Sequence, residues 1–193
     1  MANQQRRDQI TDAALQLFDE LGYHGTSMGD IAKSVGMSAS SLYNHFGSKQ
    51  EVLAEIMRTG MERLLRTHAA ALAGIDEPVE QLRASMATHV EFHARNNRAV
   101  RVTNNEILSL EEPTRSVVKQ LRRDYVARWV DIVDRGMRQG VFTVADEKIT
   151  CYGLIDMGMG VSLWYRDDAN YSPQELGLLY AQAALRQCGY YED

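Results

Sequence analysis

The side chains of this chain that could do chemistry gather between residues 38 and 49, where hydroxyl, amide, imidazole and ammonium groups occur without a carboxylate. Such groups bind phosphate oxygens and the edges of bases, and small residues among them let a helix approach a DNA groove closely. The chain has no nucleophile elbow, no phosphate-binding glycine loop and no convincing pair of carboxylates. We therefore expect recognition of nucleic acid and no enzymatic activity.

Two short helices around a turn must position these groups. Glycine, serine and threonine are frequent from residue 22 to residue 48, and they divide this stretch into predicted helices at about 28–35 and 39–45. The turn between them is Gly36-Met37-Ser38, with Ser38 as the expected cap of the second helix. This order is the sequence form of a helix-turn-helix, whose second helix enters the major groove of DNA.

The charge of the chain limits how it could bind DNA. Its formal net charge is −5, from 21 Lys and Arg against 26 Asp and Glu, which argues against coating nucleic acid or an anionic membrane by bulk charge. Residues 31–50 contain Lys33 and Lys49 but no acid. We therefore expect one small DNA contact in each subunit, with modest sequence-independent affinity that salt lowers steeply.

The composition indicates a folded protein of one or two domains, with 193 residues of which 45% are hydrophobic. Cys151 and Cys188 stand far apart, so we expect neither a disulfide framework nor a cysteine zinc site, and a cytoplasmic location fits best. The N-terminus lacks the apolar region of a secretion signal. The apolar stretch 152–165 is interrupted by Asp156, so no membrane span or membrane partner is expected.

The rest of the chain predicts an all-α protein, because apolar residues recur at helical spacing and no strand-like alternation is found. Capping-box patterns at Ser48–Glu51 and Ser172–Glu175 mark the start of two helices. Three prolines, at 78, 113 and 173, stand where further helices begin. We expect about nine helices: one that ends at about 21, and others at about 28–35, 39–45, 48–73, 78 onward, 97–110, 113–140, 146–166 and 173–188.

Two glycines, Gly158 and Gly160, lie inside the predicted helix 146–166, where each costs about 1 kcal/mol relative to alanine. Three explanations are open. The glycines could allow close helix approach at a subunit interface, with alanines of the last helix as small partners, namely Ala181, Ala183 and Ala184. They could also make room for a ligand, or simply break the helix.

Residues 10–53 resemble the tetracycline-repressor (TetR) family. The family pattern occurs in order, at Ile10 through Phe18, Gly22-Tyr23, Thr26-Ser27-Met28, Asp30-Ile31-Ala32, Val35 through Ser38, Leu42 through Phe46, Ser48-Lys49 and Leu53. The resemblance implies phosphate contacts by Thr26, Tyr43, His45 and Lys49, and base contacts by Ser38, Ala39, Ser40, Ser41 and Asn44. Thr26 also lies near a helix N-terminus, which favours phosphate.

Each of these residues also has a purely structural interpretation. Ser38 could serve only as a cap, Tyr43 only as a core aromatic, and Lys49 only as a solvated lysine of a first helical turn. Residue 40, often glycine in the family, is serine in this chain. The operator sequence therefore does not carry over from the family.

The resemblance further implies a DNA-binding domain at 1–48 and an effector-binding and dimerisation domain at 49–193. Such proteins form homodimers through their last two helices and hold an effector among the middle ones. Trp164-Tyr165-Arg166 and residues 172–176 resemble a branch that regulates lipid and sterol breakdown in response to acyl-CoA thioesters. Residues 150–165 lack the Arg or Lys cluster that would bind the CoA phosphates, so the class of ligand stays open.

Candidate pocket residues are the Met, aromatic and uncharged polar residues of the middle helices, which would hold an apolar or aromatic molecule. They are Met61, Met86, His89, His93, Asn104, Tyr125, Trp129, Met157 and Met159. The alternative is that most of them are plain core. His89 and His93 have the i, i+4 spacing of metal ligands, but no third ligand is evident, so neither a metal nor another cofactor is expected.

The leading hypothesis is a transcriptional repressor. It would bind a palindromic double-stranded DNA operator as a homodimer and be released by a small, largely apolar effector. The alternative is a DNA-anchored interaction protein on the same scaffold, which positions a protein partner.

Overall fold

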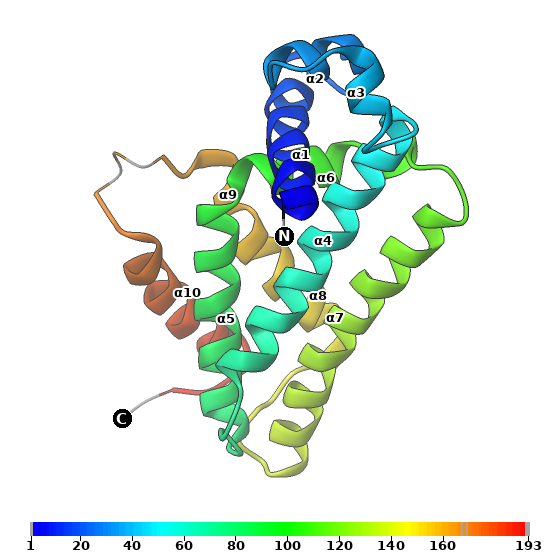
Figure 1. Ribbon diagram of the computed structural model, residues 1–193. Helices are drawn as coiled ribbons and strands as arrows, with labels where there is room; N and C mark the ends of the chain where they lie inside the picture. The colour runs from blue at the N-terminus through cyan, green and yellow to red at the C-terminus, as the bar shows by residue number, and fades with distance from the viewer. Residues whose placement is uncertain (1, 167, 169, 192–193) are drawn as a thin grey trace. The chain divides into compact units, whose positions relative to one another are not determined.

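The computed structural model describes residues 2–166, 168 and 170–191, and within this part of the chain it is helical with no strand (Figure 1). The all-α prediction with an N-terminal helix-turn-helix is confirmed. The helices are α1 (Ala2–Leu21), α2 (Met28–Ser34), α3 (Ala39–Tyr43), α4 (Lys49–Ala71), α5 (Pro78–Arg95), α6 (Asn97–Asn105), the 3₁₀ helix η1 (Ile107–Ser109), α7 (Thr114–Arg138), α8 (Glu147–Met159), α9 (Val161–Trp164) and α10 (Pro173–Gln187).

Serine side chains begin several of these helices, as the capping patterns predict. Ser172 accepts a hydrogen bond from the backbone N–H of Glu175, whose carboxylate accepts from the N–H of Ser172, so α10 opens with a complete capping box. At the start of α4 the arrangement differs. Ser48 Oγ accepts from Glu51 N at 3.2 Å, but the Glu51 carboxylate accepts from Gly47 N at 2.8 Å.

The predicted helix 146–166 is divided at Gly160, which follows α8 and precedes α9. The helix break that the glycines left open as an explanation is therefore present. This division raises the α-helices of the described residues to ten, compared with the nine expected. The predicted segment 97–110 also ends in a 3₁₀ turn rather than continuing as α-helix.

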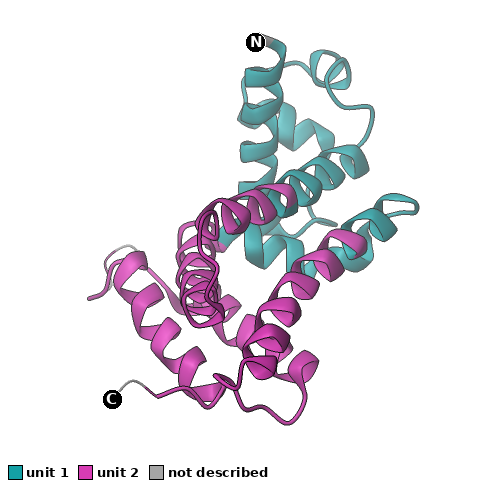
Figure 2. Cartoon of the chain, turned by 90° about the horizontal axis from the view of Figure 1, so that it is seen from below, with its two compact units in different colours: residues 1–61, 98–119 teal, residues 62–97, 120–193 magenta. Residues whose placement is uncertain are grey.

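The chain forms two compact units, shown in separate colours in Figure 2. Unit 1 consists of residues 1–61 and 98–119, and unit 2 consists of residues 62–97 and 120–193. The divisions at residues 61 and 119 fall inside α4 and α7. The expected division into a DNA-binding domain at 1–48 and an effector-binding and dimerisation domain at 49–193 is based on function rather than on compactness. It stays a prediction.

The core of unit 1 joins the N-terminal helices to a later segment of the chain. Leu42 and Phe46 are fully buried, as expected for the inward side of α3, and they lie in one cluster with the apolar face of α1. Val102, Leu110 and Val118 belong to the same cluster. The burial of their apolar surface therefore stabilises the helix-turn-helix through residues more than fifty positions away.

Glycines allow close helix packing inside unit 2. A Cβ on Gly158 of α8 would lie 2.5 Å from His89 Cδ2 of α5, and one on Gly177 of α10 would lie 2.7 Å from the carbonyl oxygen of Ala87. Ala181 and Ala184 are also buried within this chain. Gly158 and these two alanines therefore pack inside one subunit, which argues against the interface explanation for them, whereas Ala183 is exposed.

None of the helices in the described part of the chain is long and apolar enough to cross a membrane.

Candidate functional site

A tight turn sets α3 at the surface of unit 1. Ser27 caps α2 in a reciprocal bond with Asp30, and Gly36 follows α2 with a φ of 66°. This left-handed conformation suits glycine because it has no Cβ to clash with the backbone. Met37 N then donates to Ala32 O at 2.8 Å, which closes the turn. The chain thus enters α3 at Ser38, whose hydroxyl accepts from Ser41 N.

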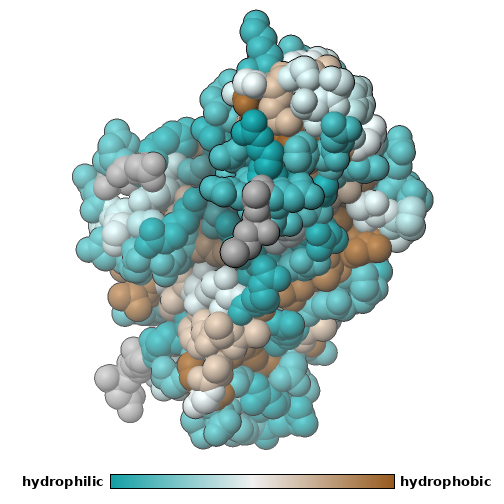
Figure 3. Space-filling view, in the orientation of Figure 1, coloured by the Kyte–Doolittle hydropathy of each residue, from teal (hydrophilic) through white to brown (hydrophobic). Residues whose placement is uncertain are grey.

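The start of α3 presents small polar side chains to solvent. The hydroxyl of Ser38 lies 3.0 Å from that of Ser40 and 3.1 Å from that of Ser41. Figure 3 shows a largely pale surface over α2 and α3, as expected for residues of near-neutral hydropathy. Ala39, Ser40 and Asn44 are exposed as well. This face can therefore approach a polar partner without an exposed charge of its own.

Tyr43 is 52% exposed, so its interpretation as a core aromatic is wrong. His45 is half-buried at the end of α3, and its Nδ1 lies 3.1 Å from Asn3 Oδ1. The ring of Tyr43 is free to present its hydroxyl to a partner. The ring of His45 is held in place by its contact with Asn3 of α1.

Thr26 and Lys49 have structural partners that the sequence did not reveal. The hydroxyl of Thr26 is buried and donates to Gly22 O at 2.9 Å. Lys49 Nζ donates to Tyr23 O and Thr26 O, both at 2.7 Å, so Lys49 is not simply solvated. An ammonium has three N–H donors, which leaves Lys49 one donor beyond these two bonds. Phosphate contacts by either residue stay predictions.

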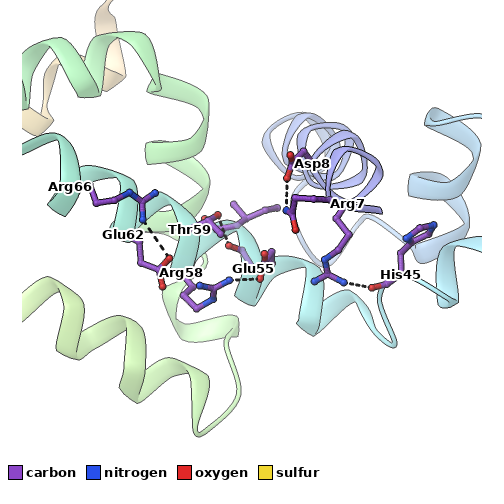
Figure 4. Close-up of polar contacts among 10 residues, drawn as sticks. Arg7, Asp8, His45, Glu55, Arg58, Thr59, Glu62 and Arg66 are labelled. Atoms are coloured by element: carbon purple, nitrogen blue, oxygen red, sulfur yellow. Dashed lines mark hydrogen bonds and ion pairs between the residues drawn. The ribbon is translucent and has the colours of Figure 1, made fainter. Parts of the chain in front are cut away.

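Arg7 holds the end of α3 and was missed by the sequence analysis. Its guanidinium donates to the carbonyl oxygen of His45 (Figure 4), and its central carbon lies 3.9 Å from the centroid of the Phe46 ring. His45 directly follows Asn44, the C-cap of α3, so this bond fixes the chain where it leaves the helix. Arg7 precedes Ile10 by three residues on the buried face of α1, which is the signal that could have identified it.

A second set of polar bonds ties the segment 98–111 to the helix-turn-helix within unit 1. Arg101 makes a two-point ion pair with Asp19 of α1, with N–O distances of 3.1 and 2.7 Å. Gln50 Nε2 donates to Ser109 O at 2.6 Å, and Gln50 Oε1 accepts from Glu111 N at 3.2 Å. These bonds therefore couple the position of this segment to the positions of α1 and the start of α4.

Four of the predicted pocket residues form a buried polar cluster in unit 2. His89 Nε2 donates to Ile155 O at 3.0 Å, and its Nδ1 lies 2.8 Å from the hydroxyl of Tyr125. His93 Nδ1 donates to His89 O at 2.7 Å, and the ring of Trp129 packs edge-on against His89. Burial lowers the pKa of His93 to about 4 and that of His89 well below its usual value, so both rings are neutral at pH 7.

The other predicted pocket residues do not take part in these polar contacts, although Met86 lies next to His89 at Gly158. Met86 is buried beside Gly158, while Met157 and Met159 are half-buried on α8. Met61 and Asn104 belong to unit 1. Effector contacts by these nine residues stay predictions. Within the described ranges, no group of three His, Cys, Asp or Glu side chains is arranged to hold a metal ion.

Unit 2 has a groove of about 460 Å³ that the sequence analysis did not identify. None of the nine predicted residues lines it. Its walls come from α4, α5 and α7, and they consist of His68, Ala69, Leu72, Gln81, Ala127, Arg128, Asp131, Ile132 and Arg135. His68 continues the buried face of Leu64 and Leu65 on α4. A histidine on an apolar helical face was the available signal.

Comparison with known proteins identifies two matching family models. Residues 10–56 match the model of the bacterial regulatory proteins of the tetR family, and residues 75–188 match the tetracyclin repressor-like C-terminal domain. The HTH-type transcriptional repressor KstR2 of Mycobacterium tuberculosis is 26% identical over 182 residues, which cover 93% of this chain and 91% of the relative.

Solved structures have the same fold. The TetR family regulator PfmR of Thermus thermophilus has a TM-score of 0.84 and 32% identity, covering 95% of this chain and 99% of that one. AibR, solved in complex with isovaleryl coenzyme A and operator DNA, has a TM-score of 0.82 and 25% identity, covering 93% of this chain and 96% of that one. The exposed start of α3 lies within the part of the chain that matches the first family model.

Proposed function

The chain belongs to the tetR family of bacterial regulatory proteins, and we propose that it is a transcriptional repressor that a small, largely apolar effector releases from a palindromic operator. The observation that carries this proposal is the exposed, acid-free start of α3 behind a tight Gly36 turn. A helix end of this kind can enter a major groove without charge repulsion.

In the proposed complex, the N-terminal half of α3 reads bases and the surrounding residues bind phosphate. The base-reading residues are Ser38, Ala39, Ser40, Ser41 and Asn44. Tyr43, His45 and the remaining donor of Lys49 bind phosphate, while Thr26 supports them by fixing the loop that Lys49 binds. The serine hydroxyls that bond one another in the free protein rotate to meet DNA, because a hydroxyl both donates and accepts.

A homodimer presents two copies of α3 to one face of DNA. Successive major grooves lie about 34–36 Å apart, so a two-fold dimer matches a palindrome with that spacing. Apolar side chains exposed on α8 and α10 support this pairing, since large apolar side chains exposed to water favour a partner surface. They are Ile149, Tyr152, Leu178 and Leu179.

The effector is proposed to bind in the C-terminal domain. The groove in unit 2 supports this, as does the isovaleryl coenzyme A in the complex of the related AibR. An effector that binds one conformation better shifts the population toward it. The bonds of Asp19 and Gln50 to the segment 98–111 offer a route by which such a shift reaches the helix-turn-helix.

Fluorescence anisotropy with a DNA fragment from upstream of the chain's own gene tests this function. We expect saturable binding that unlabelled unrelated DNA does not displace, weakened about tenfold by Tyr43→Ala through loss of one charge-assisted phosphate bond. Tyr171→Ala is the matched control, because Tyr43 and Tyr171 are both 52% exposed. Binding that is equally tight to any DNA, or that is equal for wild type and Tyr43→Ala, contradicts the proposal.

A further inference from the structure

The exposed side chains at α3 differ in how well they can tell one base from another. The exposed residues of this helix and its caps are Ser38, Ala39, Ser40, Tyr43 and Asn44. Alanine has no polar group, and a hydroxyl both donates and accepts, so it bonds either kind of base edge. Only the amide of Asn44 holds a donor and an acceptor side by side in a fixed order.

The other amide of the acid-free segment 31–50 is used inside the protein. Gln50 Nε2 donates to Ser109 O at 2.6 Å, and Gln50 Oε1 accepts from Glu111 N at 3.2 Å. The side chain of Asn44, in contrast, makes no hydrogen bond to another described residue. The amide of Asn44 is therefore available to a partner, whereas that of Gln50 is not.

Charged side chains of the same segment do not supply an alternative reader. Residues 31–50 contain no Asp or Glu to accept from cytosine and no Arg to pair with guanine. Lys49 Nζ bonds the carbonyl oxygens of Tyr23 and Thr26. Lys33 lies on α2, the helix that crosses the DNA backbone in this motif. Discrimination between bases therefore falls to the free amide at the end of α3.

The backbone on both sides of Asn44 is fixed. Leu42 and Phe46 are fully buried in the core of unit 1, and the carbonyl oxygen of His45 accepts from the guanidinium of Arg7. A short side chain on a fixed backbone loses few rotamers on binding, and it holds its hydrogen-bonding atoms in one place. Asn44 is thus positioned for a contact that depends on exact geometry.

We propose that Asn44 reads one adenine in each half of the operator, with its amide oxygen accepting from adenine N6–H and its amide N–H donating to adenine N7. The major-groove edge of adenine presents this donor and acceptor together, whereas that of guanine presents two acceptors. The inference rests on the proposed function, because it names a base that the repressor recognises. A two-fold dimer places this adenine at equivalent positions of the two half-sites.

Selection from a pool of DNA duplexes with a randomised central segment tests this assignment. Sequencing the duplexes that wild type retains gives the base preference at every position. We expect one strongly preferred A·T pair in each half-site that loses its preference in Asn44→Ala. In Asn44→Arg the same position should become G·C, because a guanidinium bonds guanine O6 and N7 together.

Matched controls come from another exposed asparagine of unit 1. Asn105 ends α6, outside the helix-turn-helix. Asn105→Ala and Asn105→Arg make the same chemical changes as the two Asn44 variants, and they should keep the wild-type base preferences. Thermal melts of all four variants show whether each is folded.

A duplex with 7-deazaadenine at the preferred position tests the contact with the unaltered protein. This base lacks the N7 acceptor but still pairs with thymine. We expect wild type to bind it about fivefold more weakly than the adenine duplex, as for one lost hydrogen bond. Asn44→Ala should bind the two duplexes equally, with affinity measured by fluorescence anisotropy. A merely structural role of Asn44 would not depend on the N7 atom of one base.

The outcomes separate this inference from the proposed function. Specific selection in which no position responds to Asn44→Ala, or in which the responding position is a G·C pair, overturns the inference and leaves the proposed function standing. Equal binding of the adenine and 7-deazaadenine duplexes by wild type does the same. A pool that wild type does not enrich contradicts the proposed function, and the inference falls with it.

Discussion

The start of α3 and the buried cluster of unit 2 use polar side chains in opposite ways. The hydroxyls of Ser38, Ser40 and Ser41 bond one another at the surface, where water or DNA can replace each partner at little cost. In unit 2, His89 and Tyr125 meet partners that no solvent can replace. Polar groups at the surface can therefore exchange partners freely, whereas polar groups in the core depend on partners within the protein.

Acid should have the largest effect, because it acts on the buried histidines of unit 2. The pKa values of His68 and His93 are lowered to about 4 in the folded chain, so the unfolded chain binds more protons between pH 6.5 and 4 and the folded state loses stability as the pH falls through this window. From pH 7 to pH 5 we expect the free energy of unfolding to fall by about 2 kcal/mol for each of these two histidines.

Urea denaturation at both pH values measures this loss. An equal free energy of unfolding at pH 7 and pH 5 would mean that the core histidines are hydrated in solution.

A negative charge on α3 should lower operator affinity without lowering stability. Ala39→Asp places a carboxylate in the face of α3 that is proposed to enter the major groove, and operator affinity should fall about a hundredfold through repulsion by the DNA's negative charge. The same carboxylate lies in the first turn of α3, where the helix dipole favours it, so the melting temperature should not fall. Anisotropy and thermal melts measure the two effects, and Ala39→Asn is the uncharged control. Unchanged affinity for Ala39→Asp would place the DNA contact elsewhere.

Packing against the cluster gives the next effect. Gly158→Ala places a methyl group against His89 and should lower the free energy of unfolding by about 2 kcal/mol, as overpacking does. Gly153→Ala, on the same helix, meets only the flexible side chain of Gln187 at 3.4 Å and should be neutral or slightly stabilising. Equal denaturation midpoints for the two variants would show that α5 and α8 separate easily.

The smallest expected effect concerns Arg7, which bonds the end of α3 without reaching outward. Arg7→Ala should weaken operator binding about fivefold to tenfold by loosening the helix end. The slope of log affinity against log salt should stay that of Arg6→Ala, since neither variant removes a phosphate contact. A shallower slope for Arg7→Ala would instead make Arg7 a direct phosphate ligand.

Much of unit 1 could be predicted because its signals are local. The turn at Gly36, the cap at Ser38 and the inward position of Leu42 follow from residues within four positions of one another, as does the cap at Ser172 in unit 2. The partners of Lys49 and Arg7 lie 23 to 38 positions away in sequence. No local pattern contains that information.

The groove was missed for a related reason. Met, His and aromatic residues at helical spacing indicate which face of a helix is buried, but not which faces leave space between them. His93, a predicted pocket residue, bonds the backbone of His89 inside the core. The groove is instead lined by His68 and two arginines, none of which was among the predicted site residues. The sequence alone could not decide whether the helix breaks at Gly160, because packing determines whether a helix continues through glycine.

The position of the unit boundaries matters for engineering. Because Val102, Leu110 and Val118 complete the core around α1 and α3, a fragment that stops at residue 61 would expose the apolar surface they cover. A chimera that exchanges the helix-turn-helix between relatives must therefore exchange residues 98–119 together with the first 61 residues. Swaps of the N-terminal segment alone should yield proteins that aggregate or melt early.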